Sequence, residues 1–254
     1  MHGSGNDFIL INCLAKNELK NPSAAAKKLC DRHFGIGADG LILVLKSKKA
    51  DFMMRIYNPD GSEAEMCGNG IRCFAKYVLD KKLINRKNLK IETMAGIREV
   101  EAISSQFRVD MGKPSEIRQQ KINLKEKTIT ATCLSMGNPH CVVFVDESDF
   151  DVKALGWEIE NHKLFPKRTN VEFVKVKNKN SVEAVVWERG AGLTLACGTG
   201  ACAVAVASVR NGKTGKNVYV MLPGGRIKIE WAENNHVYMT GPAETIFEGA
   251  FSLV

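Results

Sequence analysis

The chain is 254 residues long, with 44% hydrophobic and 25% charged residues and a formal net charge of +8. This length and apolar content suffice for one large or two modest domains, each able to bury a core. The positive charge comes from lysines scattered in surface-like runs without an aromatic stacking motif, which argues against a nucleic-acid partner.

The sequence also argues against a membrane partner. It starts on Met1-His-Gly-Ser-Gly without a signal peptide, and its longest apolar runs, such as residues 41–45 and 141–145, have only strand length. Of the eight cysteines, several lie inside apolar runs (Cys13, Cys141), which suits a reducing compartment better than a disulfide framework. We therefore expect a soluble, cytoplasmic protein.

In chain order, the pattern predicts a mixed α+β fold with many short alternating strands. An amphipathic helix is expected at residues 23–32, with Ser23 as its N-cap. Two further helices are expected directly after Cys67 and Cys197. Both are apolar nearly all round, so we expect them to be central and buried.

The chain contains an internal repeat built around those two cysteines. Cys67-Gly-Asn-Gly-Ile-Arg-Cys in the first half matches Cys197-Gly-Thr-Gly-Ala-Cys in the second. Each copy follows a Gly-Asn and an apolar strand, and precedes a strand pair with a small-residue turn. A matching signature closes each half, at Val109-Asp-Met-Gly-Lys-Pro and Val237-Tyr-Met-Thr-Gly-Pro.

The repeat predicts two homologous domains with a boundary near Gly112. The first is expected to span residues 1–112, and the second residues 113–241. By pseudo-symmetry, the tail at residues 242–254 is expected to cross back and pack on the first domain.

The repeated cysteines also carry a chemical prediction. A glycine-rich helix N-terminus presents unpaired N–H groups that favour an anion, and it lowers the pKa of a thiol from about 8.5 toward neutrality. A lone cysteine beside glycine is more often packing than chemistry. Two cysteines at equivalent positions of a repeat favour a catalytic role instead. We expect both thiols to face a common cleft and to act on opposite faces of one carbon.

Taken together, these motifs resemble the diaminopimelate epimerase family over essentially the whole chain. The resemblance rests on Gly5-Asn-Asp-Phe8, Asp60-Gly-Ser62, Cys67-Gly-Asn-Gly-Ile-Arg-Cys73, Gly137-Asn-Pro-His140, Arg168-Thr-Asn170, Glu188-Arg-Gly190, Ala196-Cys-Gly-Thr-Gly200, Pro223-Gly-Gly-Arg226 and Met239-Thr-Gly-Pro242. It implies an α+β fold of two pseudo-symmetric domains of the diaminopimelate epimerase-like type, each a mixed or antiparallel sheet wrapped around a central helix.

The implied activity is conversion of LL-2,6-diaminopimelate to the meso form, in lysine and peptidoglycan precursor synthesis, without pyridoxal phosphate or metal. The resemblance implies Cys67 and Cys197 as the acid/base pair. It implies substrate binding by Asn6, Asn58, Gly68, Asn69, Asn138, Asn170, Glu188, Arg189, Gly198 and Thr199. Glu188 suits an ammonium and Arg189 a carboxylate of this substrate.

Some positions depart from the family pattern. Gly40 stands where some members have glutamine, and Leu193 where some have glutamate. Phe247 stands where some have a tyrosine linked to dimerisation, and the implied assembly is a homodimer. The short strand that usually precedes Met-His-Gly is expected to be missing. His140 is either a supporting residue near the site or a satisfied turn histidine.

Two alternatives stay open from the sequence. Isomerases of the proline racemase or phenazine-biosynthesis type resemble this fold, but they leave Asn170, Glu188 and Arg189 without a distal amino-acid group to bind. A non-catalytic redox sensor would use Cys67 and Cys197 as a reversible disulfide. Exchange of substrate α-hydrogen with solvent deuterium, on diaminopimelate, on proline and without substrate, separates these possibilities.

Overall fold

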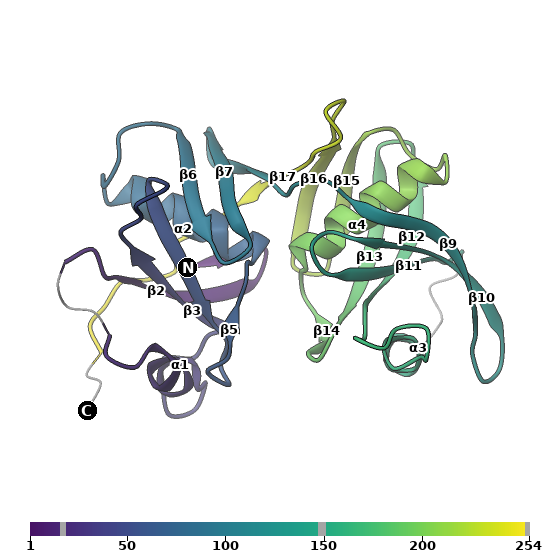
Figure 1. Ribbon diagram of the computed structural model, residues 1–254, viewed down its shortest axis with the longest axis horizontal. Coiled ribbons are helices and arrows are strands. Elements are labelled where there is room, and N and C mark those ends of the chain that lie inside the picture. The colour runs from purple at the N-terminus through teal and green to yellow at the C-terminus, as the bar shows by residue number, and fades with distance from the viewer. Residues whose placement is uncertain (16–18, 147–150, 252–254) are drawn as a thin grey trace. The chain divides into compact units, whose positions relative to one another are not determined.

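The computed structural model describes residues 1–15, 19–146 and 151–251. The chain divides into two compact units (Figure 1), one formed by Met1–Val109 with Gly241–Val254 and the other by Asp110–Thr240. The two crossings between units, after Val109 and after Thr240, lie within a few residues of the boundaries expected at 112 and 241. Within the described ranges, no helix is both long and apolar enough to span a membrane.

The described residues of the first unit form two helices and seven complete strands, and an eighth strand reaches the boundary of the unit. In chain order they are β1 His2–Gly3, β2 Asn6–Asn12, α1 Pro22–Cys30, β3 Gly40–Leu45, β4 Phe52–Tyr57, β5 Glu63–Ala64, α2 Gly68–Asp80, β6 Asn88–Thr93, β7 Gly96–Ile103 and β8 Gln106–Asp110.

The second unit repeats this order of elements with one more strand before its first helix. It contains β9 Ser115–Asn123, β10 Thr128–Ser135, β11 Pro139–Phe144, α3 Val152–Glu160, β12 Asn170–Asn178, β13 Ser181–Glu188, β14 Gly192–Thr194, α4 Gly198–Arg210, β15 Asn217–Leu222 and β16 Gly225–Trp231, and ends on β17 Val237–Pro242.

From β2 in the first unit and β11 in the second, the strands pair in the same pattern. In the first unit, β2 pairs parallel with β3, β3 antiparallel with β4, and β4 parallel with β6. Strand β6 then pairs antiparallel with β7, and β7 antiparallel with β8. In the second unit, β11 pairs parallel with β12, β12 antiparallel with β13, and β13 parallel with β15. Strand β15 then pairs antiparallel with β16, and β16 antiparallel with β17. Each unit is therefore a mixed sheet with one long helix, as the repeat predicts.

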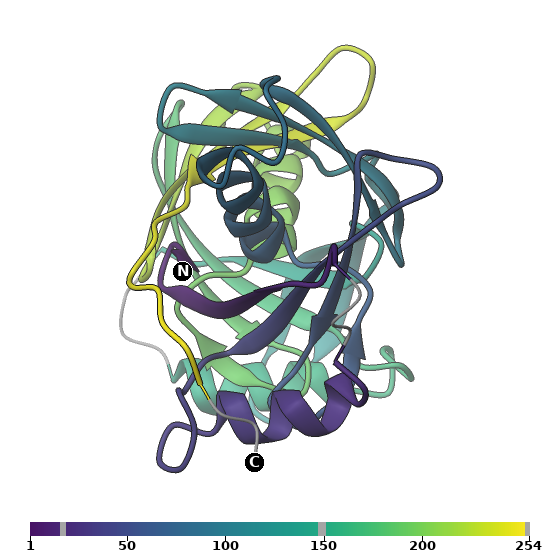
Figure 2. The ribbon, with the colours of Figure 1, turned by 90° about the vertical axis from the view of Figure 1, so that its left-hand side faces the viewer.

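Two helices lie on opposite faces of the strands in each unit. Figure 2 shows α1 and α2 on either side of β2 and β3. Because side chains alternate along a strand, Leu41 and Leu43 of β3 pack with α1, while Ile42 faces Gly70 at the start of α2. In the second unit, Val171 and Phe173 of β12 belong to the core cluster under α3. The residue between them, position 172, therefore faces α4.

The helices after the two cysteines are buried, as expected. Every residue of α4 from Ala201 to Ser208 is buried, and so is α2 from Gly68 to Ala75. Small side chains, mostly alanine and valine in α4, allow the helix to lie close to the strands around it.

The expected cap of the first helix is wrong. The helix begins at Pro22, and its N-cap is Asn21, whose Oδ1 accepts a hydrogen bond of 3.0 Å from Ala24 N. Proline at the first helical position is a common helix start, because its missing N–H would have no partner there. Ser23 instead donates its hydroxyl to Gly61 O at 2.8 Å.

The segment after Thr240 belongs to the first unit through backbone and side-chain bonds. His2 N donates to Glu244 O at 2.9 Å, and Glu244 N donates to His2 O at the same distance. Arg72 of α2 is fully buried and donates to Pro242 O at 3.0 Å, Gly68 O at 3.1 Å and Ser4 Oγ at 3.2 Å. This guanidinium therefore joins both chain ends to the helix that follows Cys67.

Candidate active site

Cys67 is the N-cap of α2. Its backbone is extended, with φ −134° and ψ 123°, and Gly70 N donates to its Sγ at 3.5 Å. Its carbonyl accepts the first helical bond, from Ile71 N at 2.9 Å. The sulfur is thus held at the positive end of the helix dipole, beside N–H groups that have no acceptor within the helix.

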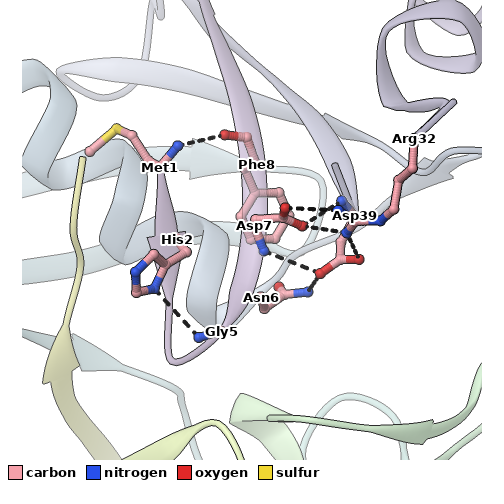
Figure 3. Close-up of polar contacts among 8 residues, drawn as sticks. All are labelled: Met1, His2, Gly5, Asn6, Asp7, Phe8, Arg32 and Asp39. Atoms are coloured by element: carbon pink, nitrogen blue, oxygen red, sulfur yellow. Dashed lines mark hydrogen bonds and ion pairs between the residues drawn. The ribbon is translucent and has the colours of Figure 1, made fainter. Parts of the chain in front are cut away.

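Asn6 lies beside this sulfur. The Cys67 thiol donates to Asn6 Oδ1 at 3.7 Å. On its other side, Asn6 Nδ2 donates to Asp39 Oδ2 at 3.0 Å, as Figure 3 shows. Arg32 bonds the carboxylates of both Asp7 and Asp39. Burial works to raise the pKa of Asp7, but hydrogen bonds from Arg32 and Asp39 outweigh it and hold that pKa below its ordinary value. These hydrogen bonds fix the amide of Asn6.

The other candidates in the first unit lie on the loop and helix next to Cys67. Asn58, just after β4, donates its amide to Ser62 Oγ at 2.9 Å, so it shapes the turn that leads to Cys67. Gly68 and Asn69 are the first residues of α2, and both are buried. A Cβ on Gly70 would lie 3.0 Å from Ile42 Cδ1 and 3.5 Å from Phe8 Cζ, so apolar side chains pack behind this first turn.

Cys197 is the N-cap of α4 in the same way, with φ −119° and ψ 116°. Its Sγ lies 3.5 Å from Thr199 Oγ1, and Cys197 is only 6% exposed. Burial raises the pKa of the Cys197 thiol well above its ordinary value, and the charge of Glu188 raises it further. The expectation of a lowered thiol pKa is therefore wrong for Cys197, because desolvation outweighs the helix dipole.

Asn138 and His140 connect to Cys197 through hydrogen bonds. Asn138 Nδ2 donates to Thr199 Oγ1 at 3.3 Å, and its Oδ1 lies 2.9 Å from His140 Nε2. The other ring nitrogen, Nδ1, lies 2.6 Å from Glu172 Oε1. His140 is therefore bonded on both sides, in a chain that ends at the sulfur. Gly198, another candidate, is the first residue of α4 and is buried.

The sequence reasoning missed Glu172. It is 0% exposed, burial raises the pKa of its carboxyl, and the His140 ring opposes that rise. Its signal is visible in the sequence as a lone charged residue inside an apolar strand, Asn170-Val-Glu-Phe-Val174. Charged side chains are almost never fully buried unless they are paired, so such a residue marks a partner elsewhere in the fold.

The remaining candidates lie where β12 begins and β13 ends. Asn170 is buried, donates to Pro139 O at 2.9 Å and accepts from Arg189 N at 3.0 Å. It therefore joins the strand carrying His140 to the backbone at Arg189. Glu188 accepts from Thr194 Oγ1 at 2.7 Å, and the exposed Arg189 side chain bonds Lys167 O at 3.3 Å.

Each unit thus combines a cysteine at a helix N-terminus, the N–H groups of the first helical turn, and an asparagine connected to the sulfur, directly for Asn6 and through Thr199 for Asn138. A thiol can exchange a proton with a carbon acid, and the N–H groups can bind the carboxylate next to that carbon. No group of three or more His, Cys, Asp or Glu side chains in the described ranges is arranged to hold a metal ion.

Comparison with known proteins gives matches over the whole chain. The family model described as diaminopimelate epimerase matches residues 1–117 and 132–246. The diaminopimelate epimerase of Acetivibrio thermocellus is 50% identical, covering 100% of this chain and 97% of its own length. The one from Methanococcus maripaludis strain S2 is 47% identical, covering 100% of this chain and 98% of its own length.

Solved structures with low sequence identity share the fold. A probable proline racemase from Agrobacterium radiobacter matches with a TM-score of 0.74 at 14% identity, over 100% of this chain and 92% of that one. A phenazine biosynthesis protein of Bacillus anthracis matches with a TM-score of 0.72 at 15% identity, over 95% and 92%. The expected fold class is confirmed by these likenesses.

Proposed function

The chain belongs to the diaminopimelate epimerase family, and we infer from this that it converts LL-diaminopimelate to the meso form in the route to lysine. The observation that carries the proposal is the occurrence, once in each unit, of a cysteine as the N-cap of a buried helix. We assign the acid/base roles to Cys67 and Cys197.

The proposed chemistry is proton removal on one face of the α-carbon and proton return on the other. One cysteine acts as the thiolate base while the other supplies a proton. Because burial raises the pKa of Cys197, we assign the proton of the active pair to Cys197 and the thiolate to Cys67, which reaches that state by giving up the hydrogen that it donates to Asn6 Oδ1 in the structure. After one turnover the two protonation states are exchanged.

Stabilisation of the carbanion is the main energetic task. An amino-acid α-carbon is a weaker acid than a thiol by on the order of ten pK units, which is about 14 kcal/mol. N–H donors aimed at the developing charge contribute roughly 3 kcal/mol each. We assign this role to the first turns of α2 and α4, at Gly68-Asn69 and Gly198-Thr199.

The distal end of the substrate needs its own partners. We assign Glu188 to the distal ammonium and Arg189 to the distal carboxylate, because both lie at the end of β13 in a half-buried or exposed position. Asn6, Asn58 and Asn138 supply neutral donors and acceptors near the two sulfurs. Asn170 acts on the site from behind, through Pro139 and the backbone of Arg189.

The test is an α-hydrogen exchange experiment in deuterium oxide. Incubation with LL-diaminopimelate should incorporate deuterium at one α-carbon and give the meso product, measured by mass spectrometry and chiral chromatography. Proline, offered under the same conditions, should incorporate none. Exchange on proline, or no exchange on either compound, would overturn the assignment of this substrate.

We also propose a cytoplasmic homodimer. The exposed side chains of Ile246 and Phe247, which are 57% and 63% accessible, lie in the segment that the family resemblance links to dimerisation. Sedimentation velocity should give the mass of two chains, whereas a monomer at micromolar concentration would contradict this proposal.

Oxidation should inactivate the enzyme reversibly. Peroxide converts the more accessible thiolate, assigned to Cys67, to a sulfenic acid, and the thiol of Cys197 then displaces water to form a disulfide. Activity should return with dithiothreitol, and bound diaminopimelate should slow the loss. Peptide mapping of the inactive protein provides the measurement. A cross-link elsewhere, or inactivation with both thiols still reduced, would show that the two sulfurs do not reach disulfide distance.

A further inference from the structure

The second unit contains a continuous chain of hydrogen bonds that ends on the sulfur of Cys197. It runs from Glu172 Oε1 to His140 Nδ1 at 2.6 Å, and from His140 Nε2 to Asn138 Oδ1 at 2.9 Å. Asn138 Nδ2 then donates to Thr199 Oγ1 at 3.3 Å, and Thr199 Oγ1 lies 3.5 Å from Cys197 Sγ.

From His140 Nε2 to Thr199, the donors in this chain point toward the sulfur. Asn138 Oδ1 is an acceptor, so His140 Nε2 must carry a hydrogen. That contact turns the amide so that Asn138 Nδ2 donates to Thr199. Thr199 Oγ1 accepts this hydrogen and keeps its own hydroxyl hydrogen, which it can donate to Cys197 Sγ, 3.5 Å away, when that sulfur is a thiolate. A thiolate at Cys197 is stabilised by such a donor.

Glu172 and His140 share one further proton. If the ring is charged, Nδ1–H donates to a carboxylate, and if the ring is neutral, a protonated Glu172 donates to Nδ1. In both cases the pair is neutral overall, and Nε2 keeps its hydrogen. Glu172 therefore holds the ring at Nδ1 in the orientation that makes Nε2 the donor.

The first unit has apolar residues at the positions that correspond to Glu172 and His140. In the strand register, His140 is opposite Asn170 in β12, while Phe8 is opposite Gly40 in β3. Glu172 therefore corresponds to Ile42, and His140 to Phe8. A Cβ on Gly70 would meet Ile42 Cδ1 at 3.0 Å, whereas one on Gly200 would meet Glu172 Oε1 at the same distance.

An ionisable pair at this position costs stability that an apolar pair would not. Both side chains are 0% exposed, and Glu172 Oε2 is buried without a hydrogen-bond partner. Buried polar groups that lack partners destabilise a fold, and an apolar replacement of similar volume is often neutral or stabilising. Since Ile42 and Phe8 fill the equivalent space in the first unit, packing alone does not account for Glu172.

We propose that Glu172 is a positioning residue for the Cys197 half of the reaction, acting through His140, Asn138 and Thr199. It offsets the burial of Cys197 by keeping the Thr199 hydroxyl directed at the sulfur when Cys197 must become the base. The inference rests on the proposed function of Cys197. This role makes the surroundings of Cys67 and Cys197 chemically different, because the first unit has the apolar residues Ile42 and Phe8 in place of the Glu172–His140 pair.

The test compares Glu172→Gln with Glu172→Ile. Gln can donate its amide hydrogen to His140 Nδ1 and so keep Nε2 as the donor, whereas Ile copies the residue of the first unit and removes the contact. We expect kcat of Glu172→Ile to fall about tenfold or more, with KM little changed, and kcat of Glu172→Gln to stay within about threefold of wild type. Val174→Ala, on the same face of β12, is the matched control for disturbance of the strand.

Kinetic isotope effects in the two directions of the reaction distinguish a positioning role of Glu172 from a purely structural one. With α-deuterated substrate, the effect in Glu172→Ile should rise in the direction in which Cys197 removes the hydrogen. It should fall in the opposite direction, where Cys197 only returns a solvent proton. Val174→Ala should leave both effects at their wild-type values.

Proton NMR of protein labelled with nitrogen-15 in its histidine rings tests the geometry without using activity. The Nε2–H signal of His140, identified by its absence from His140→Asn, should be sharp in wild type and Glu172→Gln and broadened or absent in Glu172→Ile. This arm stands even if diaminopimelate is not the substrate. Equal losses in the Gln and Ile variants, unchanged kinetics in the Ile variant, or an unaltered Nε2–H signal in it would each overturn the proposal.

Discussion

Replacing Cys67 or Cys197 by alanine should abolish epimerisation, lowering kcat by at least about 10⁴-fold, the upper range of a single proton-transfer group. Each variant lacks one of the two groups needed to remove and return a proton on opposite faces, so neither direction can be completed. Chiral chromatography of the LL and meso forms measures the loss.

Two other cysteines of the same helices serve as matched controls. Cys73 and Cys202 are fully buried inside α2 and α4, a turn or more beyond the N-caps. Their replacement by alanine should cost about 1 kcal/mol of stability through lost packing, with activity largely retained. Near-wild-type turnover in Cys67→Ala or Cys197→Ala would show that these thiols are not the acid/base pair.

Arg189→Met should severely weaken binding of the diamino diacid. The Arg189 side chain is exposed, and its described hydrogen bond goes to Lys167 O, so the guanidinium has donors to spare for a carboxylate. Leaving a distal carboxylate unpaired costs about 2–5 kcal/mol. Steady-state kinetics should therefore show a fall in kcat/KM of roughly 30-fold or more.

Arg118→Met, at an exposed position on β9 of the same unit, controls for loss of a surface charge. Arg189→Lys should recover part of the binding, because it restores the charge without the two-pronged geometry of the guanidinium. Unchanged KM and kcat in Arg189→Met would remove this residue from the site.

Much of the fold could be predicted because local pattern and tertiary role agree. The helices after Cys67 and Cys197 follow from glycine-rich starts and apolar runs, and the structure has them at Gly68–Asp80 and Gly198–Arg210. The repeat predicted two homologous halves, and the strands from β2 to β8 pair in the same pattern as those from β11 to β17, because copies of one sequence bury their faces in the same way.

What the sequence could not provide depends on distant contacts. Ser23 was expected as the cap because serine is a good cap residue, but Asn21 is one as well, and only the contact to Gly61 O shows that the Ser23 hydroxyl is used elsewhere. The raised pKa of Cys197 comes from burial by segments far along the chain, which no local pattern reports. Glu172 was missed because its partner, His140, is 32 residues away.

The contact from Arg72 to Pro242 has a consequence for synthesis of the chain. The donor lies in the helix after Cys67, and its acceptor comes 170 residues later. When the ribosome has synthesised the chain through β8, the first unit still lacks its C-terminal segment, Gly241–Val254. The second unit, Asp110–Thr240, is one continuous stretch and is complete earlier. Although domains generally fold from the N-terminus onward, here the Cys197 half-site is finished before the Cys67 half-site, and a premature stop near the C-terminus damages the half that was begun first.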